Sequence, residues 1–72
     1  MPPVPSVPGA KVVRALERLG FKALRTRGSH VIMRHPDGRG TAVPVHSGKD
    51  MPKGTLRNVM ADTGLTAEQI GG

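Results

Sequence analysis

The sequence predicts a small α+β domain in which two helices cover one face of a three-stranded antiparallel sheet, in the order α-β-β-β-α. Three observations support this fold class. Apolar residues recur at helical spacing in one segment near the start of the chain and in another near its end. The segments between them indicate short strands separated by turns rich in Gly, Pro and Asp. A chain of 72 residues also has room for only one core of this kind.

The first helix is predicted over residues 9–19. Its apolar positions recur at steps of three and four residues and form one face: Val12, Val13, Leu16 and Leu19. Gly20 supplies the residue that ends the helix, and Phe21 is placed for the apolar contact that follows such a glycine. At about 100° per residue, three basic residues fall on the opposite face: Lys11, Arg14 and Arg18. We therefore expect one face in the core and a basic stripe on the other.

Prolines set the expected limits of the domain. Residues 1–8 hold four of the seven prolines and little that could cap a helix or pair with a strand. We expect them to form a flexible lead outside the fold. The domain itself is predicted over residues 9–70, and residues 71–72 are expected to be a frayed end.

Three strands are predicted between the helices, over residues 22–26, 30–35 and 40–45. Arg27-Gly28-Ser29 provides the first turn, and Pro36-Asp37-Gly38 provides the second. Pro44 cannot donate a hydrogen bond to a neighbouring strand, because its nitrogen carries no hydrogen. The third strand is therefore expected at an edge of the sheet.

Alternation along the second strand divides its side chains between two faces. One face carries His30 and Arg34, and the other carries Val31 and Met33, with more apolar volume. Alternation alone leaves open which face is buried. If the apolar face packs beneath the helices together with Val43, then His30 and Arg34 are exposed.

A second helix is predicted over residues 55–63, with Thr55 as its N-cap and Gly64 as its stop. Its expected core positions are Leu56, Val59 and Met60. Thr66 and Gln69 fit a capping box, in which two side chains cap each other's backbone N–H groups. A last short helical turn is therefore expected after the second helix.

The positive charge is concentrated in the first half of the chain. The formal net charge is +6, and the segment from Lys11 to Arg34 carries seven basic side chains against one acidic side chain, Glu17. This asymmetry suggests a surface that faces a polyanion, although a basic run is also what an ordinary solvated surface carries.

The sequence contains one Phe, Phe21, and neither Trp nor Tyr. Stacking platforms for single strands are therefore disfavoured, whereas recognition of a duplex through its backbone needs only basic and polar groups.

The composition also limits the class of protein. The absence of Cys excludes disulfides and thiolate metal sites. The sequence contains no apolar run close to the length of about 20 residues that a membrane helix needs, and no apolar core of a signal peptide. We expect a cytoplasmic protein that does not act at a membrane.

Histidines are the only side chains here that titrate near neutral pH, so any acid–base catalysis would use them. His30 and His35 lie five residues apart on one predicted strand and point to opposite faces, so we expect no metal site. In Gly28-Ser29-His30, the glycine permits close approach of a phosphate, the serine adds a hydroxyl, and His30 could act on a ribose 2′-hydroxyl. Arg34 could stabilise the charge that develops on the phosphate. The alternative is an ordinary turn with an exposed histidine.

Two further positions could contribute. His46, at the end of the third strand, could supply a second imidazole or have only a structural role. Lys53 lies near the start of the second helix with Lys49 and Arg57, where backbone N–H groups also favour a phosphate. His35, directly before Pro36, is expected to be a turn residue.

Six short motifs follow one another along residues 9–70. They are Leu16-Glu17-Arg18-Leu19-Gly20-Phe21, Arg27-Gly28-Ser29-His30, Arg34-His35-Pro36-Asp37-Gly38, Val43-Pro44-Val45-His46, Lys53-Gly54-Thr55-Leu56 and Gly64-Leu65-Thr66. None is specific alone, but the ordered set resembles the HicA (YcfA-like) toxin family. The predicted order of elements is also that of double-stranded RNA-binding domains, and the resemblance implies a fold of that kind.

The resemblance implies a toxin of a toxin–antitoxin system, an mRNA interferase that is neutralised by a HicB antitoxin. It also implies that His30 is the catalytic residue, with Gly28 and Ser29 as its setting. The chain departs from the family pattern at Val31-Ile32-Met33, where relatives often have an aromatic residue, and at Ile70, where Phe is frequent. Neither change touches the expected chemistry.

Three classes of function follow from these observations. The first is a metal-independent endoribonuclease that cleaves mRNA through His30 without a small-molecule cofactor. Its RNA-binding residues are expected to be Lys11, Arg14, Arg18, Arg27, Gly28, Ser29 and Arg34. The second is a non-catalytic module that binds double-stranded RNA. The third is an interaction subunit whose basic first helix docks an acidic protein.

Overall fold

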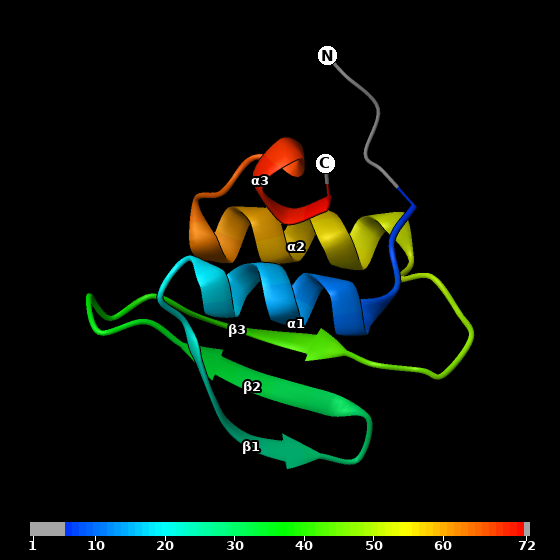
Figure 1. Cartoon of the computed structure of the whole chain (residues 1–72), viewed down its shortest axis with the longest axis horizontal. Helices are drawn as coiled ribbons and strands as arrows, with labels where there is room; N and C mark the ends of the chain where they lie inside the picture. The colour runs from blue at the N-terminus through cyan, green and yellow to red at the C-terminus, as the bar shows by residue number, and fades with distance from the viewer. Residues whose placement is uncertain (1–5, 72) are drawn as a thin grey trace.

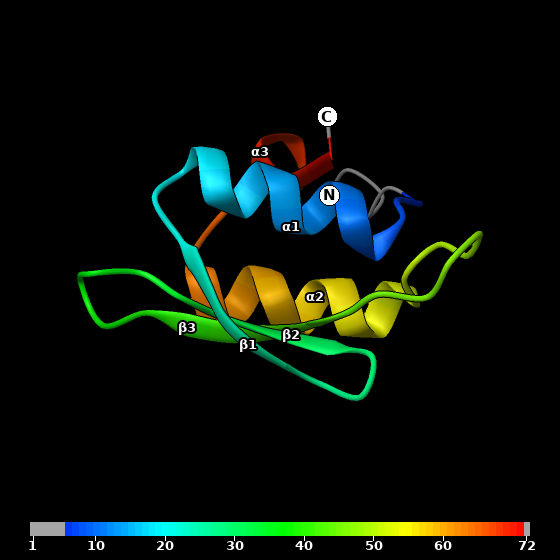
Figure 2. The same cartoon turned by 60° about the horizontal axis from the view of Figure 1, so that its bottom comes forward.

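A computed structural model describes residues 6–71 of the chain. Its elements are α1 (Gly9–Arg18), β1 (Lys22–Arg27), β2 (His30–Arg34), β3 (Gly40–Pro44), α2 (Lys53–Thr63) and α3 (Ala67–Gly71). The strands form one antiparallel sheet in the order β1-β2-β3. The long helices α1 and α2 lie on the same face of this sheet, and α3 packs against α1 (Figures 1 and 2). The predicted α+β fold is confirmed, and β3 is an edge strand.

The core lies between the helices and the inner face of the sheet. On that face Met33 is 1% exposed and Val43 is fully buried, whereas His30 and Arg34 on the other face are exposed. This settles the question that alternation left open. The helices and their flanking segments supply the other large buried side chains: Val12, Leu16, Phe21, Leu56, Val59 and Ile70.

The end of α1 follows the predicted pattern. Gly20 has a φ of +97°, which glycine adopts without strain, and its N–H donates to the carbonyl of Glu17. The N–H of Phe21 donates to the carbonyl of Leu16 at 3.0 Å, and the Phe21 ring is buried. These two bonds form a Schellman motif. Leu19, however, was expected on the apolar face and is instead the C-cap, with 37% of its surface exposed.

Two residues outside the predicted range of residues 9–70, Val7 and Gly71, belong to the fold. Val7 is 3% exposed and belongs to the core, and its carbonyl accepts a bond of 2.8 Å from the N–H of Met51. Pro8 pairs with Asp50. Val7, two residues before α1, therefore belongs to the core, although the prolines around it favoured a lead outside the fold. At the other end, Gly71 is the last residue of α3. Residues 1–5 and 72 of the predicted ends lie outside the described residues.

The second helix begins two residues earlier than predicted. α2 starts at Lys53, and Thr55 lies inside its first turn rather than at the N-cap. The cap is Pro52, whose carbonyl accepts a bond from the N–H of Leu56 at 3.0 Å and whose φ of −57° suits the entry to a helix. Gly64 ends α2 as predicted.

The predicted capping box before α3 is present. The Thr66 N–H donates to the Gln69 side chain at 2.8 Å, and the Gln69 N–H donates to the Thr66 hydroxyl at 3.2 Å. The sequence signal for this short helix is therefore confirmed.

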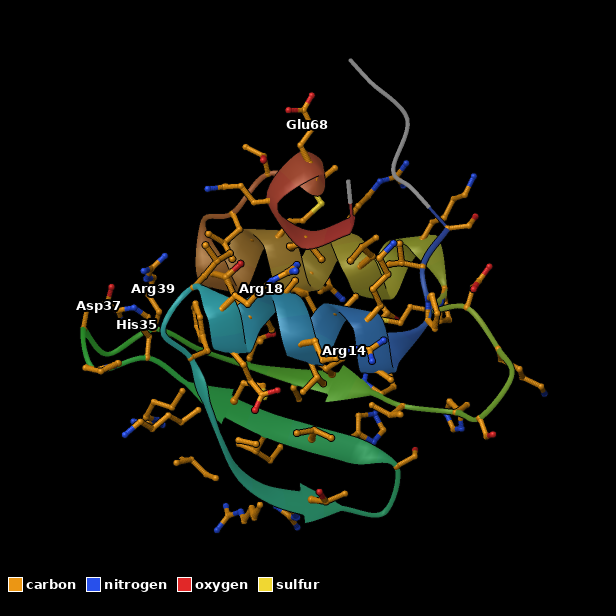
Figure 3. All side chains as sticks on the ribbon, in the orientation of Figure 1. Arg14, Arg18, His35, Asp37, Arg39 and Glu68 are labelled. Atoms are coloured by element: carbon orange, nitrogen blue, oxygen red, sulfur yellow. The ribbon has the colours of Figure 1, made fainter. Side chains whose placement is uncertain are left out.

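The turn between β2 and β3 is tied to the end of α2, as Figure 3 shows around His35, Asp37 and Arg39. The Arg39 guanidinium donates to Asp37 at 2.8 Å and to the backbone carbonyl of Thr63. Nδ1 of His35 accepts a bond from the Asp37 N–H, and its ring packs edge-on against Phe21 with ring centroids 5.0 Å apart. His35 is therefore a turn residue with a structural role, as predicted.

Candidate functional site

A tight hairpin turn places His30 at one end of the sheet. Arg27 and His30 are paired across β1 and β2, so Gly28 and Ser29 form a two-residue loop. Of these two, only Gly28 has a positive φ, at +59°, as the first position of a type II′ turn requires. His30 is consequently the first residue of β2, with an exposed side chain, and Arg27 lies directly across from it.

His46 lies beside the same turn. The Val45 N–H donates to the Ser29 carbonyl at 2.7 Å, which extends the pairing of β2 and β3 one step past His30 and Pro44. The hydroxyl oxygen of Ser29 is 3.5 Å from Nε2 of His46. The structure therefore brings Ser29, His30 and His46 together at the end of the sheet.

The outer face of the sheet, which the helices leave uncovered, is basic. Residues paired across strands share a face, so the register places four exposed basic residues with His30: Lys22, Arg25, Arg27 and Arg34. None of the three strands contains an acidic residue. A face with one sign of charge raises the local concentration of a polyanion. We call these four residues together with His30 the outer basic face.

Sequence reasoning did not assign Lys22 and Arg25 to the site. Simple alternation from Lys22 puts Arg25 on the inner face, but the register shifts between Ala23 and Arg25, which returns Arg25 to the outer face. The irregularity leaves Leu24 58% exposed. An excess of basic residues in the first strand was the available signal.

Two predicted partners of His30 lie far from it. Arg34 is four residues further along β2, which corresponds to about 13 Å at 3.3 Å per residue. Arg34 therefore lies at the other end of β2, and Arg27 is the cation nearest to His30 along the pairing. Arg18 lies at the far end of α1, toward the turn that holds Asp37 (Figure 3).

The predicted basic stripe is present on α1. Its three residues are exposed and, with Glu17, line one surface depression: Lys11, Arg14 and Arg18. The buried side of α1 faces the sheet, so this stripe and the outer basic face belong to different sides of the molecule.

The starts of α1 and α2 lie at the same end of the molecule as the β1–β2 turn, as both views show (Figures 1 and 2). Lys53 is the exposed first residue of α2, and Lys11 lies in the first turn of α1. These two lysines, Arg27, His30 and His46 therefore belong to one end of the fold. This end of the fold therefore gathers cations from three elements, α1, β1 and α2.

Two further properties concern residues 6–71. Among them, no cluster of three or more His, Asp or Glu side chains is placed to hold a metal ion. Within the same range, no helix combines the length and the apolar character needed to cross a membrane.

Comparison with known proteins agrees with this arrangement. The chain matches a family described as the HicA toxin of bacterial toxin–antitoxin systems over residues 9–65, which span α1 to α2. The chain belongs to the HicA toxin family. The match includes the β1–β2 turn, His30 and His46, and it confirms the resemblance that the ordered motifs indicated. A comparison with curated proteins gives no match.

Proposed function

We propose that this HicA-family chain is a metal-independent endoribonuclease, an mRNA interferase that cleaves mRNA in the cytoplasm and thereby blocks translation. The observation that carries the proposal is the position of His30. Its side chain is exposed at the end of the sheet, and its backbone position pairs with that of Arg27 in the neighbouring strand. The strands of this face contain no acidic residue. An imidazole among cations suits chemistry on a phosphodiester.

The proposed reaction uses the ribose 2′-hydroxyl of the RNA itself. His30 removes the 2′-hydroxyl proton, and the oxygen attacks the adjacent phosphorus. The bond from phosphorus to the 5′ oxygen breaks, leaving a 2′,3′-cyclic phosphate, and the departing 5′ oxygen takes up a proton to become a 5′-hydroxyl. Arg27, directly across from His30, is placed to stabilise the negative charge that develops on the phosphate oxygens. A Cβ atom added to Gly28 would meet no neighbouring atom within 4 Å, so a phosphate can approach this backbone.

Basic and polar residues on several elements are proposed to hold the RNA backbone. They are Lys11, Arg14 and Arg18 on α1, Lys22, Arg25, Arg27 and Arg34 on the sheet, Gly28 and Ser29 in the turn, and Lys53 at the start of α2. Contacts of this kind recognise charge and shape and carry little sequence information.

The test is incubation of a defined mRNA with the wild-type chain and with His30→Ala, both in excess EDTA. We expect fragments from the wild type and a loss of about 10²- to 10⁴-fold in the variant, the range that general acid–base catalysis contributes. His35→Gln removes a histidine at the other end of the sheet and is the matched control, which should remain active. Equal cleavage by His30→Ala would contradict the proposal.

A non-catalytic module that binds double-stranded RNA is the second candidate, favoured by the fold and by the basic stripe on α1. It predicts a shift of duplex RNA on a native gel that weakens steeply with salt, without strand scission and without a requirement for His30. Intact RNA with such a shift, for wild type and His30→Ala alike, would support this candidate instead.

The partner that fits the family is an antitoxin of the HicB type, which we propose masks the RNA-binding surface. Lys11, Arg14 and His30 should then become protected when the two proteins form a complex. Protection of backbone amides and side chains measured by nuclear magnetic resonance would locate the interface. A neutralising antitoxin that left all three residues exposed would contradict masking.

A further inference from the structure

The three histidines differ in their surroundings. Nδ1 of His35 accepts the Asp37 N–H, and its ring packs against Phe21, so His35 is engaged by the β2–β3 turn. His30 and His46 are exposed and, within residues 6–71, have no carboxylate partner. Their imidazoles are therefore available to a ligand at the end of the sheet.

The end of β3 brings His46 to the turn that precedes His30. His30 pairs with Pro44, the last residue of β3, and His46 is two residues beyond Pro44. The Val45 N–H donates to the Ser29 carbonyl at 2.7 Å, so the chain stays beside the β1–β2 turn for one residue past β3. His46 therefore leaves the sheet next to Ser29, the residue before His30.

Ser29 contacts the His46 ring. Its hydroxyl oxygen is 3.5 Å from Nε2 of His46, and the serine belongs to the two-residue loop of the hairpin. Because this contact involves Nε2, Nδ1 of His46 is free of it. The same two-residue loop therefore sets the position of His30 through the backbone and of His46 through a side chain.

Cleavage through the 2′-hydroxyl needs two proton transfers. One proton leaves the 2′ oxygen as it attacks phosphorus, and one proton must reach the departing 5′ oxygen. A single imidazole between them can serve only one of the two at a time. Two imidazoles on opposite sides of one phosphodiester can serve both.

We propose that His46 is a second catalytic residue, the general acid of the reaction in which His30 is the base. This inference rests on the proposed ribonuclease function. In the step, the 2′ oxygen forms its bond to phosphorus while its proton passes to His30. The bond from phosphorus to the 5′ oxygen breaks, and the 5′ oxygen takes a proton from the imidazolium of His46. Exchange of protons with water then restores both histidines. Ser29 is a positioning residue for His46.

The test compares two RNA oligonucleotides that differ in one atom. In the first the leaving group is the ordinary 5′ oxygen, and in the second it is a bridging 5′ sulfur, which leaves as a thiolate and needs no proton. We expect His46→Ala to slow cleavage of the oxygen substrate by about 10²- to 10⁴-fold and to cleave the sulfur substrate at close to the wild-type rate. His30→Ala should be slow on both substrates.

Ser29 is tested with the same pair of substrates. Ser29→Ala should slow cleavage of the oxygen substrate less than His46→Ala does, and its defect should be smaller on the sulfur substrate, where only a contact of Ser29 with the RNA backbone would still count. Ser29→Thr keeps the hydroxyl and should cleave the oxygen substrate faster than Ser29→Ala does. A defect of Ser29→Ala of equal size on both substrates would contradict its role as a positioning residue for His46.

The outcomes separate this inference from the proposed function. A wild-type chain that cleaves neither substrate would overturn both. If the wild type is active and His46→Ala cleaves the oxygen substrate equally well, the inference fails and the ribonuclease proposal stands. A folded His46→Ala that is slow on both substrates would also overturn the role as general acid. His46 is exposed and outside the strands, so circular dichroism should show an intact fold.

Discussion

The carboxylate of Asp37 is the main acceptor of the β2–β3 turn. Its Oδ1 accepts the backbone N–H of Arg39 at 3.0 Å, and its Oδ2 accepts the guanidinium of the same residue at 2.8 Å. The backbone hydrogen bond from Arg39, followed by the side-chain bond and the charges of Arg39 and His35, holds the pKa of Asp37 below its usual value near 3.8. The ionised form is therefore favoured by the folded state.

This pKa predicts how the stability of the fold depends on pH. The pKa of Asp37 is lower in the folded state than in the unfolded state. Its contribution to the free energy of unfolding is therefore fully present above the unfolded-state pKa and is lost as pH falls through the folded-state pKa. The free energy of unfolding should therefore decline below about pH 4, and less steeply for Asp37→Asn than for the wild type. Urea unfolding across this range measures both slopes, and identical slopes would rule out the contribution.

At the scale of elements, the start of α1 packs directly on the end of β3. A Cβ atom added to Gly9 would overlap the carbonyl oxygen of Pro44. This close approach positions Lys11 and the rest of the basic stripe relative to the end of the sheet that carries His30 and His46. Only a residue without a side chain fits there.

We therefore expect Gly9→Ala to destabilise the fold by about 1–3 kcal/mol, the range for forced overpacking. The matched control is Gly54→Ala in the first turn of α2, where an added Cβ meets nothing within 4 Å. That variant should be neutral or stabilise by up to about 1 kcal/mol, because alanine is the better helix former. Chemical denaturation of both variants compares them, and an equal effect would show that the contact with Pro44 is not tight.

Elements marked by local signals were predictable from the sequence. The Schellman end at Gly20, the turn at Gly28 and the capping box at Thr66 each depend on a few neighbouring residues, although the turn is one residue shorter than predicted because Arg27 belongs to β1. The start of α2 was not predictable in this way. The residue before its cap, Met51, bonds to Val7, which is far away in the sequence, and a pattern within the helix does not record such a contact.

Within the candidate site, features that depend on neighbouring residues were also predictable, and features that depend on strand pairing were not. The turn that presents His30 was predictable because its glycine and its alternation are local. The outer basic face was not, since the shift in register before Arg25 appears only when β1 pairs with β2. The contact of Ser29 with His46 likewise depends on how far β3 continues beside β2, which no pattern within either strand records.

At the scale of the whole molecule, the net charge of +6 is divided between two surfaces. The outer basic face includes His30, and its strands contain no acidic residue. The stripe on α1, in contrast, shares its surface with Glu17. If RNA reaches His30 along the sheet, the outer basic face should make more of the phosphate contacts than the stripe does.

Two double variants of equal charge test this division. Lys22→Ala with Arg25→Ala, and Arg14→Ala with Arg18→Ala, each remove two positive charges, so a difference between them reports location alone. Each lost phosphate contact should reduce the slope of log affinity against log salt concentration by roughly 0.7–0.9. We expect the sheet variant to lower the slope by roughly 1.4–1.8 and the α1 variant to lower it by less. The measurement is RNA affinity between about 50 and 200 mM salt, with His30→Ala as the background to prevent cleavage. A larger effect from the α1 variant would place the RNA on the helical side and leave the outer basic face free for another ligand.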